Sequence, residues 1–157
     1  AQLIISEDKA NDTLLALSAT YMDRAVDKDP DWMGYKYLKI QTDALNKRTD
    51  TVHASIEELL KMDDVSSKAL NSAAWFLVED ERLNDAFVAD GLLLAQKANE
   101  LTKGENPVVI DTLAYATFKN GDIDEAIKLQ EKALKLYPGD ERLIQRLETY
   151  KKAKEHK

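Results

Sequence analysis

The residue types that perform catalysis are few in this chain and lie far apart. There are two histidines, His53 and His156, and no cysteine. Neither histidine has a nucleophile or carboxylate at the spacing of a catalytic pair, so both are expected on the surface. Without cysteine, disulfides, thiol catalysis and thiolate metal sites are excluded within these residues. We therefore predict no enzyme active site.

Two acidic runs are the remaining candidates for chemistry. The run "DIDE" at residues 122–125 does not have the spacing of a calcium-binding EF-hand loop, and capping of a helix explains it. The run "EDE" at residues 79–81 is typical of a solvated helix end. There is no glycine-rich phosphate loop. The prediction is therefore no metal and no cofactor.

The charge balance narrows the class of partner. The chain has 22 basic and 29 acidic residues, a net charge of -7. Such a field repels phosphates, which disfavours nucleic acid and anionic membranes and favours a neutral or basic protein partner. No apolar run approaches the roughly 20 residues of a membrane span, and "AQLIIS" is too short for a signal peptide. A soluble protein is expected.

The spacing of apolar residues predicts the helices that position the histidines and the acidic runs. Only five glycines and three prolines interrupt 157 residues, which favours long helices. In the first helix, Leu14, Leu17 and Tyr21 recur at spacings of three and four and share one face. Eight helices are predicted, at about residues 8–28, 31–47, 50–62, 68–81, 84–102, 107–119, 122–136 and 140–154.

End signals support several of these boundaries. Ser66 or Ser67 can cap the fourth helix, and Asn106 followed by Pro107 is a typical helix start. Gly121 stops the sixth helix, because glycine adopts a positive φ without steric cost. Asp122 caps the seventh, and Glu125 has the spacing of a capping box.

Two independent landmarks reveal an internal repeat. Trp75 and Ile110 are 35 residues apart, and so are Ala98 and Ala133. A third, weaker similarity lies near the N-terminus. Ala25 precedes Pro30 by five residues, as Ala133 precedes Pro138. This shared spacing suggests that the first helix is the second half of a repeat unit. We predict about three repeats and a cap.

This pattern resembles the tetratricopeptide repeat family, whose units are helix–turn–helix. The residues that fit the family pattern best are Trp75, Leu113, Ala114, Gly121, Ala126, Ala133 and Pro138. Ile110, Thr117 and Gln130 stand where large aromatics are usual, and Gly91 where alanine is usual. The resemblance implies an all-α solenoid of antiparallel helix pairs. It implies one domain over residues 1–157, with degenerate repeats at 8–66, clearer repeats at 67–106 and 107–138, and a capping helix at 139–157.

A narrower resemblance concerns the "GENPVVIDTLA" joint and its flanks. They are similar to the helical segment that follows thioredoxin-like domains in some bacterial envelope proteins. No Cys-x-x-Cys is present, so no redox chemistry carries over. This resemblance implies a fragment or relative of such a protein, in the bacterial periplasm or envelope rather than the cytoplasm.

Stacked helix pairs present a concave face lined by the first helix of each pair. The residues predicted to line this groove are Tyr37, Gln41, Phe76, Asp80, Asp111, Tyr115, Phe118 and Lys119. Tyr115 and Phe118 either anchor a bound peptide or pack on the cap and the adjoining repeat. Acidic Asp80 and Asp111 favour a basic ligand over a peptide carboxylate.

The function that follows is a non-catalytic protein–protein interaction module that binds a peptide or partner helix in this groove. Two alternatives remain open. One is an accessory or regulatory segment of a larger thioredoxin-like enzyme, and the other is a self-association scaffold that uses the open N-terminal edge.

Overall fold

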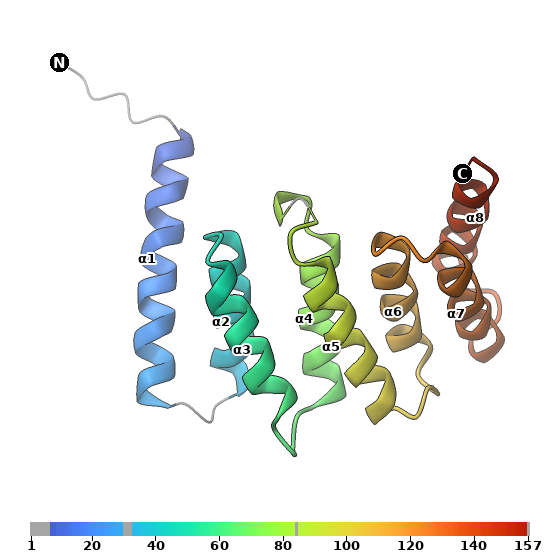
Figure 1. Cartoon of the computed structure of the whole chain (residues 1–157). Coiled ribbons are helices and arrows are strands. Elements are labelled where there is room, and N and C mark those ends of the chain that lie inside the picture. Colours follow the sequence, from blue (N-terminus) through green and yellow to red (C-terminus); the bar gives the residue numbers. More distant parts are fainter. Residues whose placement is uncertain (1–6, 30–32, 84, 157) are drawn as a thin grey trace. The chain divides into compact units, whose positions relative to one another are not determined.

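The computed structural model describes residues 7–29, 33–83 and 85–156, and every regular element in these ranges is helical (Figure 1). The chain divides into two compact units, residues 1–62 and 63–157. The proline five residues after Ala25 and the predicted helix starts at residues 31 and 84 lie outside the described residues. The all-α fold class is confirmed.

In its described residues the first unit has three helices, α1 (Glu7–Lys28), α2 (Met33–Leu45) and α3 (Thr49–Leu60). Their bounds lie within two residues of the predicted ones. α2 packs against both α1 and α3. Ala19 of α1 and Ile40 and Ala44 of α2 are buried, as the helical spacing of apolar residues requires.

Four charged side chains link α1 to α2 in this unit. Asp43 is fully buried and accepts hydrogen bonds from Lys39 at 2.7 Å and Arg48 at 2.8 Å. Asp23 of α1 accepts from the same two cations, at 2.5 and 3.0 Å. Burial raises the pKa of Asp23, but hydrogen bonds from Lys39 and Arg48 outweigh burial and hold it below its usual value. The negative charge of the buried Asp43 carboxylate is therefore balanced by two cations, Lys39 and Arg48.

One apolar face of α1 is exposed. Leu14, Leu17 and Tyr21, which share a face by sequence, are 64%, 47% and 62% exposed. The opposite side of the helix carries buried Ala19 toward α2. The amphipathic pattern of α1 therefore has more apolar surface than the packing of this unit uses.

The second unit, in the part of it that the structure describes, has five α-helices and a short 3-10 helix. They are α4 (Ser67–Glu79), η1 (Glu81–Leu83), α5 (Val88–Leu101), α6 (Pro107–Lys119), α7 (Ile123–Leu136) and α8 (Glu141–Glu155). The side chain of Ser66 accepts a hydrogen bond from the backbone of α4, and Asn106 from two backbone groups of α6. The predicted bounds of α6 are confirmed at both ends.

The turn between α6 and α7 has the predicted glycine and helix cap, with one difference. Gly121 has a φ of 95°, a conformation that favours glycine. Asp122 accepts from the backbone N–H of Glu125 at 3.1 Å, which confirms the cap. The carboxylate of Glu125, however, accepts a hydrogen bond from Lys128 at 3.0 Å. The capping box is therefore only half formed.

Helices of the second unit pack in chain order, α4 with α5, α6 with α7, and α8 on α7 (Figure 1). Small residues mark the close approaches: Ala114 of α6 and Ala126 of α7 are fully buried in one cluster. At Gly91 of α5 a Cβ would overlap Cγ1 of Val78 and lie 3.2 Å from the carbonyl oxygen of Ala74. This close contact explains why glycine replaces the usual alanine.

The predicted extent of the fifth helix is wrong at its N-terminal end. The chain between α4 and α5 instead forms η1 and a turn in which Asp85 has a φ of 61°. Phe87, which is 2% exposed, then precedes the first residue of α5, Val88. Burial of Phe87 and the left-handed Asp85 delay the start of the helix, and apolar periodicity alone does not report this.

No helix among the described residues is long and apolar enough to cross a membrane. The predicted division into repeats 8–66, 67–106 and 107–138 and a cap at 139–157 stays a prediction.

Candidate functional site

α4 and α6, the first helices of the two pairs in the second unit, contact each other directly. We call the surface that carries Trp75, Asp80, Asp111, Tyr115 and Lys119 the α4–α6 face. It holds four of the eight residues that the sequence predicts for a groove, Asp80, Asp111, Tyr115 and Lys119. Three groups of contacts organise this face, and two of them involve α8.

The first group is an aromatic pair covered by a cation. The rings of Trp75 and Tyr115 have centroids 5.4 Å apart. The guanidinium carbon of Arg146, from α8, lies 4.9 Å from the Trp75 ring centroid and 5.0 Å from the Tyr115 ring centroid. Both distances are within the range of cation–π attraction. Tyr115 therefore packs on the adjoining repeat and on the terminal helix.

Asp111 anchors the same guanidinium. One carboxylate oxygen accepts a hydrogen bond from Arg146 at 2.5 Å, and the other accepts from Nε2 of Gln130 at 2.8 Å. Gln130 is fully buried and also donates to the carbonyl of Leu143 at 3.3 Å. A glutamine stands at this repeat position, where an aromatic is usual, and it links α6, α7 and α8 through hydrogen bonds.

The second group is a stacked aromatic pair between α6 and α8. The rings of Phe118 and Tyr150 have centroids 4.5 Å apart and an interplanar angle of 21°. Tyr150 is 1% exposed, and burial raises the pKa of its phenol strongly. Its hydroxyl has no hydrogen-bond partner among the described residues. Phe118 thus packs on the terminal helix, as one of the two sequence interpretations anticipated.

The third group surrounds an open pocket of about 330 Å³. The residues that line it are Val78, Glu79, Asp80, Glu81, Asp85, Tyr115 and Lys119. Four carboxylates and one ammonium group therefore face this space. Its volume is at the lower end for ligand sites and fits one or two side chains of a larger ligand.

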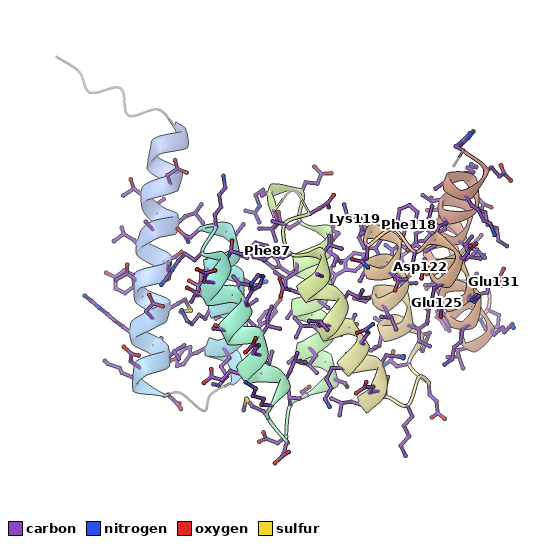
Figure 2. The ribbon with its side chains drawn as sticks, in the orientation of Figure 1. Phe87, Phe118, Lys119, Asp122, Glu125 and Glu131 are labelled. Atoms are coloured by element: carbon purple, nitrogen blue, oxygen red, sulfur yellow. The ribbon has the colours of Figure 1, made fainter. Side chains whose placement is uncertain are left out.

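Two of these carboxylates already have cationic partners. Arg82 donates to Asp80 at 2.8 Å, and this hydrogen bond lowers the pKa of Asp80. Lys119 pairs with Asp85, and the hydrogen bond raises the pKa of Lys119. Figure 2 shows Lys119 and Phe118 together at the end of α6. Glu79 and Glu81 are exposed at the pocket.

The other predicted groove residues have different surroundings. Phe76 is half-buried on α4, beside Trp75 in the sequence. Tyr37 and Gln41 belong to the first unit, where Nε2 of Gln41 donates to the Tyr37 hydroxyl at 2.9 Å. The prediction that these two residues extend the groove stays a prediction.

Metal-binding groups do not gather in the described part of the chain. No group of three or more His, Cys, Asp or Glu residues that could hold a metal occurs there. His53 and His156 are both exposed. The chemistry that the face offers is non-covalent recognition by aromatic rings, a guanidinium and carboxylates.

Sequence reasoning missed three residues of this face, Asp85, Gln130 as a polar link, and above all Arg146. A usable signal for Arg146 was present, because it lies 35 residues after Asp111, the period of the repeat. Positions one period apart fall on neighbouring units of a solenoid, so an acid and a base at this spacing can pair. Asp85 left no such signal, since its position depends on the turn before α5.

The second unit is a stack of short helix pairs that have small residues where the helices approach most closely. This architecture is that of a helical-repeat protein. Residues 87–156 match a family model described as the prolyl 4-hydroxylase peptide-substrate-binding domain, a tetratricopeptide-type domain. Comparisons with curated proteins and with solved structures found no match. The match covers just under half of the chain, and it supports the resemblance of this region to the tetratricopeptide repeat family.

Proposed function

We propose that the second unit is a non-catalytic module that binds a peptide or an extended segment of a partner protein on the α4–α6 face. The observation that carries this proposal is the match of residues 87–156 to a domain described as peptide-substrate-binding. The pocket beside Tyr115 and Lys119 supports it, since it is open and has both an aromatic wall and charged groups.

The charge of the pocket favours a neutral or basic peptide. Asp80 and Asp111 are each paired with an arginine, so they attract a ligand less than their sequence suggests. Glu79 and Glu81 are exposed at the pocket and supply the remaining negative field. Attraction between exposed charges is screened by salt, so binding of a basic peptide weakens as ionic strength rises.

A displayed peptide library tests this proposal. Selected peptides are labelled, and their dissociation constants are measured by fluorescence anisotropy with the wild type and with Tyr115→Ala and Lys119→Met. Tyr137→Ala and Lys135→Met are matched controls, because both residues are exposed and neither lines the pocket. Loss of an interface aromatic at a central position typically weakens binding by about 2 kcal/mol, or roughly 30-fold.

Binding that survives Tyr115→Ala and Lys119→Met unchanged, or that weakens equally in the two controls, would contradict the proposed surface. Phe118 is a less direct test position than Tyr115, because it does not line the pocket. Its ring stacks on Tyr150, so Phe118→Ala reports the packing of α8 as well as any contact with a peptide.

A second candidate function is an accessory substrate-binding segment of a larger enzyme. The description of the matched domain favours it, since that domain is named for an enzyme's peptide substrate. The sequence of the complete gene decides between a separate module and an accessory segment. The resemblance to the segment after thioredoxin-like domains, and with it a periplasmic location, stays a prediction.

Self-association is a third candidate, favoured by the exposed apolar face of α1. Leu14, Leu17 and Tyr21 are three side chains, whereas stable interfaces bury about 800 Å² per partner. A dimer formed through this face alone is therefore weak. Analytical ultracentrifugation over a hundredfold range of concentration, with Leu17→Asp as the comparison, decides this.

A further inference from the structure

The guanidinium of Arg146 lies where three recognition elements meet. The ring centroids of Trp75 and Tyr115 lie 4.9 and 5.0 Å from its central carbon, and the carboxylate of Asp111 accepts a hydrogen bond from it at 2.5 Å. Two aromatic faces and one carboxylate form a typical environment for binding an arginine side chain. The elements come from α4 and α6, whereas the arginine comes from the terminal helix α8.

This position is accessible from solvent. The side chains of Arg146 and Asp111 are 24% and 19% exposed, and Trp75 and Tyr115 are half-buried. Tyr115 also lines the open pocket on the same face. A ligand bound in the pocket therefore touches a residue that holds the Arg146 guanidinium.

If the guanidinium of a ligand arginine replaces that of Arg146, the contacts with the two rings and with Asp111 are kept. An incoming arginine would make the same ion pair with Asp111 and the same contacts with the two rings. Arg146 would then be released on a long side chain that reaches water. Lysine fits less well, because it lacks the planar group that stacks on rings and forks onto a carboxylate.

We propose that Trp75, Tyr115 and Asp111 form a binding site for an arginine side chain of the bound peptide, and that Arg146 occupies this site in the free protein. The inference rests on the proposed peptide-binding function and adds to it a ligand class and an internal competitor. Only molecules in which Arg146 has left the site can bind the peptide. The apparent dissociation constant is therefore the intrinsic one divided by the fraction of such molecules. Removal of Arg146 therefore strengthens binding of an arginine peptide.

The test uses three capped pentapeptides, acetyl-Gly-Gly-X-Gly-Gly-amide, in which X is arginine, lysine or citrulline. Their dissociation constants are measured by NMR titration with the wild type, Arg146→Ala and Arg146→Ala/Trp75→Leu. If Arg146 fills the site about nine-tenths of the time, Arg146→Ala binds the arginine peptide about tenfold more tightly. The lysine peptide gains less, citrulline gains nothing, and Trp75→Leu removes the gain.

Equal or weaker binding of the arginine peptide by Arg146→Ala overturns the inference, and so does an equal gain for citrulline. A measurement on the wild type is independent of any folding defect in the variant. Addition of the arginine peptide must shift the side-chain Nε–H resonance of Arg146 toward that of a solvated arginine. Binding of the peptide without this shift also overturns the inference.

Failure of this inference is distinguishable from failure of the proposed function. A library peptide that binds through Tyr115 without any dependence on arginine leaves the proposed function intact and removes the arginine site. If no library peptide binds, the proposed function fails. Ethylguanidinium then still probes the site directly, since it should raise the melting temperature of Arg146→Ala more than that of the wild type.

Discussion

Gly91→Ala tests the close packing of α4 and α5 in the second unit. In an isolated helix this change stabilises by about 1 kcal/mol, because alanine is the better helix former. Here the added Cβ overlaps Cγ1 of Val78, a β-branched side chain that is 3% exposed and has little freedom to rotate. It also lies 3.2 Å from the backbone oxygen of Ala74, which cannot move without shifting α4.

The two effects have opposite signs and similar size. Overpacking of a well-packed core costs roughly 1 to 3 kcal/mol. We therefore expect a net destabilisation by Gly91→Ala of about 1 kcal/mol, once the gain in helix propensity is subtracted. In a Val78→Ala background the overlapping atom is absent. Gly91→Ala should then be neutral or stabilising, so its effect changes sign or vanishes.

Urea unfolding measures these free energies, followed by tryptophan fluorescence in a Trp32→Phe background so that Trp75 alone reports the second unit. Gln96→Ala, at an exposed position of α5, is the matched control and should change stability by less than about 0.5 kcal/mol. A stabilising Gly91→Ala in the presence of Val78 would refute the close approach. Equal effects in both backgrounds would show that Val78 is not the obstacle.

Further changes have defined outcomes. Asp122→Ala removes the side-chain cap of α7 and should cost about 1 kcal/mol. Tyr150→Phe removes a buried hydroxyl that has no partner among the described residues, and should leave stability unchanged or raise it. Asp43→Asn removes the buried carboxylate that pairs with Lys39 and Arg48, which then keep only Asp23, and should destabilise the first unit by about 2 kcal/mol. Asp23 has a pKa below its usual 3.8, so its contribution is present above that pH and is lost as pH falls through the lower, folded value.

Thermal unfolding followed by circular dichroism checks these outcomes. A fall in melting temperature for Tyr150→Phe would mean that its hydroxyl is hydrogen-bonded in solution. The acid dependence is measured between pH 5 and 2 for the wild type and Asp23→Asn. Identical pH profiles for the two proteins would contradict the role assigned to Asp23.

Local signals in the sequence predicted much of the fold. Caps such as Ser66, Asn106 and Asp122 act within one turn of chain, and the structure has each of them on the expected helix. The repeat period added long-range information, because it indicates which alanines lie at close helix contacts. The start of α5 escaped prediction, since it depends on the burial of Phe87 and the left-handed Asp85.

The candidate site was harder to predict than the helices. Helical spacing correctly gathered Asp111, Tyr115 and Phe118 on one side of α6. It could not tell that Phe118 stacks on Tyr150 or that Arg146 covers Tyr115, since these contacts depend on how α8 packs. Charge counted along the sequence also overstated the acidity of the face. Asp80 and Asp111 have arginine partners that lie on other elements.

The central claim is that the α4–α6 face of the second unit binds a peptide, and backbone amide shift mapping with a library-selected peptide tests it most directly. The account predicts saturable shifts that concentrate around Asp80, Tyr115 and Lys119, and that are lost with Tyr115→Ala while Tyr137→Ala retains them. Saturable shifts confined to α5 and α7, or a peptide that binds without moving these resonances, would contradict it.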